Sequence, residues 1–320
     1  MIIVFPTYHF LGGIFLGWSI GGMDFSVLFG AAVSSKMVKY WNAVILACVF
    51  CFLGAIFQGF KGVETLSALT TQSLTTAIIS SVAAALTITV LNLLKLPVPT
   101  SQAVIGSIAG IGIMSGNFHT QGLLKIVLCW LIAPIIAFLI AIPLYIGFSK
   151  LYNSFNFNIF QRNIFLRISL IVAGCYAAYA LGANATANIA GVFVGSGTID
   201  VNTALFIGAG SIALGMITFS RRVSEVIGKG IVKLDSYSAL IAVLGEAITV
   251  HIFAFAGVPV SMTQALVGSI IGIGVLRGYK SIRIRKLTQI LWGWIIAPVA
   301  ACIVSSLLFI AVHLKYVAPQ

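Results

Sequence analysis

The chain has 320 residues, of which 60% are hydrophobic and only 8% are charged. Soluble globular proteins have about 45–50% apolar and about 25% charged residues, so this composition excludes a water-soluble protein and predicts one embedded in lipid. The net charge of +12 is explained by basic cytoplasmic loops of a membrane protein, and we expect no nucleic-acid partner.

Ten apolar segments are candidates for membrane-spanning helices. We expect them at residues 2–22, 42–60, 72–94, 98–115, 123–148, 168–190, 203–220, 236–256, 258–276 and 288–312. The segments at 98–115 and 258–276 are short and rich in glycine, so they either cross the membrane or re-enter it as broken helices. The sequence therefore predicts an all-α polytopic membrane protein, with one transmembrane domain over residues 1–320.

The second half of the chain repeats the first. Residues 96–116 read LPVPTSQAVIGSIAGIGIMSG, and residues 258–278 read VPVSMTQALVGSIIGIGVLRG, with 11 of 21 positions identical. Residues 21–38 likewise align with 182–199, and the WLIAP sequence from Trp130 aligns with WIIAP from Trp294. We expect one repeat at about 1–160 and another at about 161–320.

The distribution of basic residues predicts that the two repeats are inverted. Five spans per repeat is an odd number, so the second repeat would enter the membrane from the opposite side. With both termini outside, all of the 18 basic residues except Lys61, Lys125 and Lys315 fall on the inner side. The sequence thus predicts a multi-pass protein of the cell membrane (plasma or inner), built from inverted-topology repeats.

Inverted repeats are typical of secondary transporters, whose sites lie at the repeat interface near the middle of the bilayer and are often built from broken helices. The first pair of segments that fits is 21–27 and 182–188, where small and polar residues replace the usual leucines. Ionisable groups in a membrane are functional by default, although amides and hydroxyls also serve as bonds between helices. The candidate site residues here are Asp24, Ser26, Asn184, Thr186 and Asn188.

The second pair of segments follows a Pro-Val step in each repeat. Proline favours a helix break or start, and the hydroxyl and free N–H groups of a new helix can bind an oxyanion without an arginine. Ordinary helix capping by Ser or Thr is the alternative. The candidates are Thr100, Ser101, Gln102, Ser261, Thr263 and Gln264.

The remaining acidic residues and glycines allow several interpretations. Glu246 lies within a span and either carries a coupling proton or is paired structurally. Glu64 and Glu225 occupy matching positions at span ends, which suggests gating, ion coupling or ion pairing. The Gly-x-x-x-Gly sequences from Gly106 and Gly268 predict close helix packing, not nucleotide binding. No motif for catalysis is present, so we expect no enzyme and no cofactor besides a coupling cation.

Taken together, these motifs resemble the inorganic phosphate transporter family, the PiT-type permeases, over almost the whole chain. That family repeats G-A-N-D-x-A-N in each half and has a later P-x-S/T-T-H-like motif in each half. The resemblance lies in GANATANIAGVFVGSGTI from Gly182, in the RRVSEVIGK run from Arg221 and in both Pro-Val segments. It implies a homodimeric symporter that carries an inorganic oxyanion with Na⁺ or H⁺.

The chain also departs from the family motifs. Ala185 replaces the second motif's aspartate, whereas the first motif keeps Asp24 without the family's asparagines, and Gln102 and Gln264 replace histidine. The resemblance then implies a Na⁺ site near Asp24, Asn184 and Asn188, with H⁺ coupling as the alternative. Family members that move sulfate look similarly degenerate, so the expected substrate is phosphate, with sulfate as the first alternative and an anion channel as the second.

Overall fold

The structure is a computed structural model that describes residues 7–69, 72–94, 98–117, 119–155, 157–221, 235–278 and 284–317. Every regular element in these ranges is a helix. The elements are η1 (Thr7–Phe10), α1 (Leu11–Ser34), α2 (Tyr40–Gln58), α3 (Phe60–Ser67), α4 (Leu74–Leu93), α5 (Thr100–Ser115), α6 (Thr120–Ser154), α7 (Ile159–Gly195), α8 (Val201–Thr218), α10 (Ser236–Phe255), α11 (Met262–Arg277) and α12 (Ile284–Val317).

The protein is an integral, multi-pass, all-α membrane protein. Within the described ranges, eight helices are long and apolar enough to cross a bilayer: α1, α2, α4, α6, α7, α8, α10 and α12. The apolar helices α5 and α11 have only 16 residues each, or about 24 Å of helix, which is short of a hydrocarbon core of about 30 Å. Eight long helices and two short ones thus correspond to the ten apolar segments expected from hydropathy, and the short ones lie in the segments 98–115 and 258–276.

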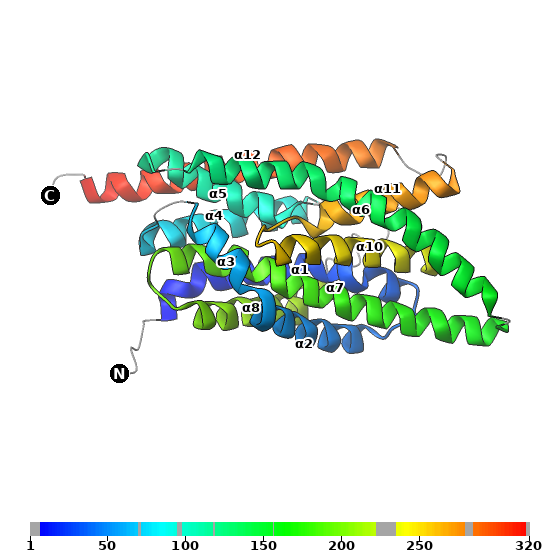
Figure 1. The fold of residues 1–320 in the computed structure, drawn as a ribbon. Helices are drawn as coiled ribbons and strands as arrows, with labels where there is room; N and C mark the ends of the chain where they lie inside the picture. The colour runs from blue at the N-terminus through cyan, green and yellow to red at the C-terminus, as the bar shows by residue number, and fades with distance from the viewer. Residues whose placement is uncertain are drawn as a thin grey trace.

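The two short helices belong to hairpins that enter the bundle from opposite ends (Figure 1). α4 packs against α5 and α10 packs against α11, and the N-termini of α5 and α11 meet in the middle of the molecule. The Ser101 hydroxyl at the start of α5 donates a hydrogen bond to the Val260 carbonyl just before α11, at 3.1 Å. The segments at 98–115 and 258–276 therefore re-enter the bundle and do not cross it.

η1 and the end of α12 lie at one end of the bundle, and the α1–α2 connection and the corner between α6 and α7 lie at the other (Figure 1). The α1–α2 connection carries Lys36 and Lys39, and Arg162 lies in the first turn of α7. Lys95, Lys229 and Lys233 lie outside the described residues. The inverted arrangement of the two repeats stays a prediction from the charge pattern.

Each short helix packs against a long helix of the other half, α5 against α12 and α11 against α6. A Cβ atom on Gly106 would lie 2.3 Å from the Pro298 carbonyl oxygen, and one on Gly268 would lie 2.1 Å from the Pro134 carbonyl oxygen. Only glycine allows such backbone contact, so the expectation that these glycines serve helix packing is confirmed.

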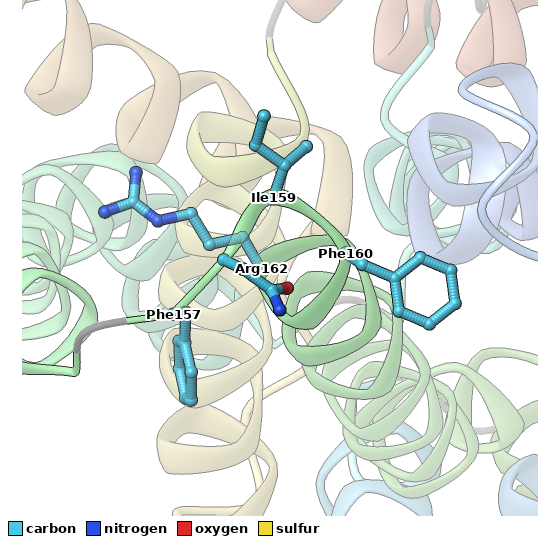
Figure 2. A pocket seen from close by; sticks show the side chains of 5 residues that line it. Phe157, Ile159, Phe160 and Arg162 are labelled. Carbon is cyan, nitrogen blue, oxygen red and sulfur yellow. The ribbon is translucent and has the colours of Figure 1, made fainter.

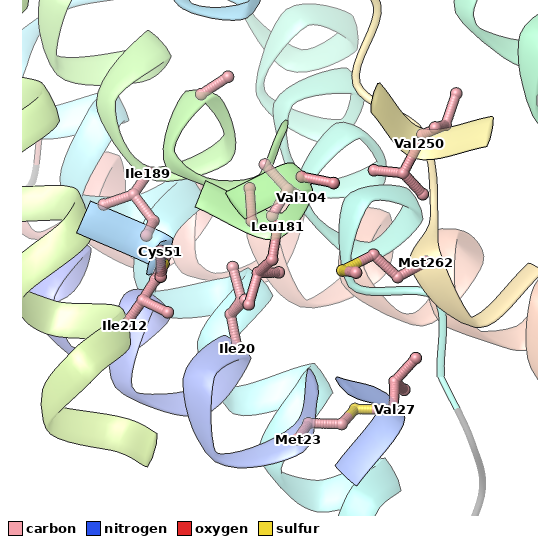
Figure 3. Close-up of a cluster of buried hydrophobic side chains, with 14 of the residues drawn as sticks. Ile20, Met23, Val27, Cys51, Val104, Leu181, Ile189, Ile212, Val250 and Met262 are labelled. Carbon is pink, nitrogen blue, oxygen red and sulfur yellow. The ribbon is translucent and has the colours of Figure 1, made fainter. Parts of the chain in front are cut away.

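α1 and α7 run through the centre of the core, where side chains from most of the helices interdigitate (Figure 3). Both helices are continuous through the segments 21–27 and 182–188. The expected helix breaks there are wrong, as are the expected bounds of 2–22 and 168–190. The small residues have another cause: a Cβ on Gly21 would lie 1.9 Å from the Ile212 carbonyl oxygen, and one on Gly182 would lie 1.9 Å from that of Cys51.

Candidate functional site

Two asparagines of α7 bind the starts of both short helices, at Ser101 of α5 and at Val260 just before α11. We call these two helix starts the hairpin tips. The Asn184 side-chain amide donates to the Val260 carbonyl oxygen at 2.8 Å and accepts from the Val260 N–H at 2.9 Å. The Asn188 amide donates to the Ser101 hydroxyl at 3.0 Å, and Ser101 in turn donates to Val260. Asn184 thus fixes the backbone that leads into α11, while Asn188 connects α7 to the start of α5.

The starts of α5 and α11 present hydroxyls and backbone N–H groups to the same buried region. Pro99 is the N-cap of α5, whereas Ser261 caps α11 and accepts a hydrogen bond from the Gln264 N–H at 3.4 Å. The Ser261 and Thr263 hydroxyls lie 2.8 Å apart. N–H groups in the first turn of a helix have no partner within the helix and form the positive end of its dipole. This arrangement is suited to an anion.

Positive side chains are missing from this region. Among the described residues, no Lys or Arg is buried, and the buried polar residues are Ser, Thr, Asn and Gln together with two acids. An anion held here would depend on helix N-termini, hydroxyls and amides for its attraction.

Two acids are buried near the starts of the short helices, Asp24 on α1 and Glu246 on α10. Their exposed fractions are 1% and 0%, and none of their four carboxyl oxygens has a hydrogen-bond partner of ordinary geometry. The Thr100 hydroxyl lies beside Asp24, and Asp24 and Glu246 are near enough for their charges to interact. Burying unpartnered carboxyl groups is costly, so a site that retains two of them is equipped to bind a proton or a cation.

Three amide oxygens in the same region are also buried without a partner: those of Gln102, Asn188 and Gln264. Buried polar atoms are normally paired, so unpaired ones indicate a place for a ligand or water. All of these atoms are oxygens, which can accept hydrogen bonds or coordinate a hard cation. No cluster of three or more His, Cys, Asp or Glu side chains that could hold a metal ion occurs in the described ranges.

The other predicted residues lie apart from this group or use their polar atoms locally. The Thr186 hydroxyl donates to the Gly182 carbonyl within α7, and Ser26 is buried on α1. Glu64 is exposed on α3. Glu225 lies outside the described residues. The structure therefore brings Asp24, Asn184, Asn188, Glu246 and the starts of α5 and α11 together, and it does not place Glu64 with them.

Two features around the site were not visible in the sequence. The Val260 backbone is the shared partner of Asn184 and Ser101, and no sequence pattern marks a main-chain partner. His251 has both ring nitrogens in hydrogen bonds, to the Tyr176 hydroxyl at 2.8 Å and to the Gln58 amide oxygen at 2.6 Å. The His251 side chain thus joins α2, α7 and α10.

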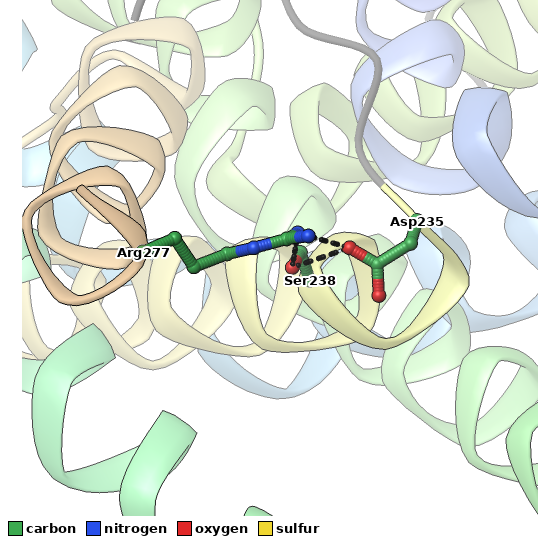
Figure 4. A network of polar contacts seen from close by, with 3 residues as sticks. All are labelled: Asp235, Ser238 and Arg277. Atoms are coloured by element: carbon green, nitrogen blue, oxygen red, sulfur yellow. Dashed lines mark hydrogen bonds and ion pairs between the residues drawn. The ribbon is translucent and has the colours of Figure 1, made fainter. Parts of the chain in front are cut away.

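A polar network joins the start of α10 to the end of α11, as Figure 4 shows. Asp235 accepts hydrogen bonds from Ser238, at 2.8 Å, and from Arg277, and Arg277 also donates to Ser238 at 2.7 Å. Partial burial alone would raise the pKa of Asp235, but the hydrogen bonds from Ser238 and Arg277 and the charge of Arg277 hold it below its usual value. The network fixes the two arms of the hairpin relative to each other.

A separate pocket lies at the corner between α6 and α7 and is lined by Phe157, Asn158, Ile159, Phe160 and Arg162 (Figure 2). Its lining includes the positively charged side chain of Arg162 but none of the residues at the hairpin tips. It is therefore not part of the candidate site.

Comparisons with known proteins agree over nearly the full chain. A family model described as the phosphate transporter family matches residues 20–305. A Methanocaldococcus jannaschii protein named "Putative phosphate permease" is 32% identical over 290 residues, which cover 91% of this chain and 92% of the relative. The "Sulfate permease CysP" of Bacillus subtilis is 31% identical over 310 residues, which cover 93% of this chain and 85% of the relative.

One solved structure, titled "The sodium-dependent phosphate transporter", has the same fold. It superposes with a TM-score of 0.85 and covers 96% of this chain and 98% of its own, at 20% sequence identity. The helical arrangement described above is therefore that of a known transporter.

Proposed function

Because the chain belongs to the phosphate transporter family, we propose that it is a secondary active symporter that carries an inorganic oxyanion, with Na⁺ or H⁺, across the cell membrane. The family consists of permeases, and the protein is a transporter rather than an enzyme. The proposed site lies between the starts of α5 and α11, with alternating access from the two sides of the membrane.

The observation that carries this proposal is the meeting of two helix N-termini that come from opposite ends of the bundle. Each supplies free N–H groups and buried hydroxyls, from Thr100 and Ser101 on α5 and from Ser261 and Thr263 at α11. A tetrahedral oxyanion has acceptor oxygens in several directions and can take donors from both helices at once. Because the donors come from hairpins of opposite orientation, the site can open toward either side of the membrane.

Charge balance supports coupling to a cation. Moving a divalent anion inward against a membrane potential of 100 mV costs about 4.6 kcal/mol, so accumulation requires at least two accompanying positive charges. Asp24 is the proposed ligand of one cation, together with the unpaired amide oxygen of Asn188. Both amide atoms of Asn184 are bonded to Val260, so we assign Asn184 to positioning the hairpin next to that cation.

The unpaired oxygens favour phosphate over sulfate. Phosphate carries O–H groups at neutral pH, whereas sulfate carries none and can only accept hydrogen bonds. The carboxyl and amide oxygens of Asp24, Gln102 and Gln264 can accept a phosphate O–H but offer nothing to sulfate. Sites that bond a substrate hydroxyl discriminate strongly against analogues that lack it. Sulfate transport is the second candidate, because one relative with 31% identity is named a sulfate permease.

Competition in proteoliposomes tests both proposals. The purified protein is reconstituted, and uptake of labelled phosphate is measured with unlabelled phosphate or sulfate as competitor. Phosphate transport predicts that unlabelled phosphate inhibits at least about tenfold more strongly than sulfate. Stronger inhibition by sulfate would make the protein a sulfate permease, and labelled phosphate or sulfate that never exceeds its outside concentration would refute symport.

We also propose that residues 1–320 form one transmembrane domain of two inverted repeats, that both termini lie outside the cell, and that the protein is a homodimer. The α4–α5 and α10–α11 hairpins, which enter from opposite ends, support the first statement, and the location of η1 and the end of α12 at the same end of the bundle supports placing both termini on one side (Figure 1). A cysteine added at either terminus should react with a membrane-impermeant maleimide in intact cells. Labelling only after lysis would contradict this orientation, and a monomeric mass in detergent would contradict the dimer.

A further inference from the structure

Glu246 stands out because it is fully buried near the middle of α10 and has no partner. Its exposed fraction is 0%, and neither carboxyl oxygen has a hydrogen bond. The matching position in the first half is Ala84 or Ala85, so the group has no symmetric counterpart and helix packing does not require it. Its carboxyl group is therefore a feature of this half alone.

No cation among the described residues is placed to neutralise Glu246. α10 packs against α1, α3, α6, α7 and α11. Four hydrogen bonds of charged or titratable groups join these helices to α10 or its N-cap, and none involves Glu246. Lys61 of α3 donates to the Phe255 carbonyl, Tyr176 of α7 bonds to His251, Tyr237 of α10 donates to the Tyr145 backbone carbonyl of α6, and Arg277 of α11 donates to Asp235. What remains for Glu246 is Asp24 of α1, which is also an acid.

Two carboxylates that interact across a buried site cannot both stay ionised while an oxyanion enters beside them. The repulsion between like charges is strong in a poorly hydrated interior, and it is relieved when one of the groups takes up a proton. Asp24 has the Thr100 hydroxyl beside it, which suits an ionised, cation-binding group. Among the described residues, none forms a hydrogen bond with the Glu246 carboxyl group, so it is the better proton acceptor of the two.

From this geometry we propose that Glu246 carries one proton per transport cycle. The inference rests on the proposed oxyanion transport and deepens it. Glu246 takes up a proton when the site is open to the side from which the oxyanion enters. It stays a neutral carboxylic acid while the site changes its access, and it releases the proton on the side where the oxyanion leaves. The negative charge in the site is then smaller by one unit during loading, and the proton gradient contributes to accumulation.

The test separates coupling from binding by measuring two kinds of flux. Wild-type protein and Glu246→Gln are reconstituted with the membrane potential clamped near zero, and phosphate accumulation is driven by a pH gradient of one unit. Exchange of labelled for unlabelled phosphate is measured in parallel at equal pH. The pH gradient also changes the ionisation of phosphate, but this effect is the same for both proteins and cancels when their accumulation is compared. Asp200→Asn is the matched control, because it makes a similar change from carboxylate to amide on the exposed N-cap of α8.

One proton fewer per oxyanion predicts a loss of about tenfold in accumulation for a gradient of one pH unit. Glu246→Gln should therefore accumulate about tenfold less phosphate than wild type, while exchange stays within about twofold because no net proton movement is needed. Glu246→Asp should retain coupling, and Asp200→Asn should behave as wild type. Direct recording of proton uptake with a pH dye should show one proton fewer per phosphate in Glu246→Gln.

Accumulation by Glu246→Gln that equals wild type would overturn the proposal and leave Glu246 as a permanently neutral structural group. A folded variant that loses exchange as well as accumulation would also overturn it, because Glu246 would then act in binding. If Glu246→Gln does not fold, Glu246→Ala takes its place, since the first half has alanine there. A wild-type protein that moves neither phosphate nor sulfate would instead refute the proposed function.

Discussion

The sharpest structural prediction concerns Gly268, where α11 contacts α6 backbone to backbone. In Gly268→Ala the new Cβ would lie 2.1 Å from the Pro134 carbonyl oxygen and 2.8 Å from the Pro134 Cα. Contacts between heavy atoms are optimal at about 3.5–4.0 Å, so the two helices must move apart by more than about 1 Å. Overpacking of this kind costs about 1–3 kcal/mol, and the higher helix propensity of alanine offsets at most about 1 kcal/mol of it.

Thermal unfolding of the purified protein in detergent measures this cost, with Gly147→Ala as the matched control. Gly147 lies in α6, and a Cβ atom added there would meet no heavy atom within 4 Å, so the control should be as stable as wild type or slightly more stable. Gly268→Ala should unfold a few degrees lower and should transport more slowly, because the start of α11 is displaced. Equal stability of the two variants would refute the proposed backbone contact between α11 and α6.

Three further outcomes follow from the polar contacts. Asp235→Asn should cost about 0.2–1 kcal/mol at neutral pH, since its partner Arg277 is also partly exposed. The folded-state pKa of Asp235 is lowered, so its contribution is present above about pH 4 and disappears on acidification, and chemical unfolding at pH 7 and below pH 4 should show this. Asp200→Ala removes the cap on Thr203 of α8 and should lower the melting temperature, whereas Asp200→Asn should not. Asn184→Ala leaves the Val260 N–H unpaired and its carbonyl bonded to Ser101 alone, so hydrogen exchange at residues 258–261 should accelerate and transport should be lost.

Hydropathy and the internal repeat were sufficient to predict the helical membrane fold, because span length and charge placement are properties of local sequence. They failed at α1 and α7, where Gly21 and Gly182 suggested helix breaks. Glycine and small polar residues serve a broken helix and a close helix contact equally well in sequence. Only the position of α8 and α2 beside these glycines distinguishes the two, and that position is a tertiary property.

In the candidate site, too, some features could be predicted from the sequence and others could not. The repeated Pro-Val segments pointed to new helix starts, and α5 and α11 do begin at Thr100 and Met262. The attachment of Asn184 to the Val260 backbone had no signal, because main-chain partners leave no mark on residue identity. Glu64 and Glu225 looked equivalent in sequence, but the structure leaves Glu64 exposed on α3, and Glu225 lies outside the described residues.

The most direct test of the account is a structure determined with saturating phosphate. Density for the anion should lie between the starts of α5 and α11, within hydrogen-bond distance of the Ser101 and Thr263 backbone N–H groups. It should disappear in Asp24→Asn if the coupled cation is needed for binding. Phosphate bound instead at the α6–α7 corner beside Arg162, with the hairpin tips empty, would contradict the proposed site (Figure 2).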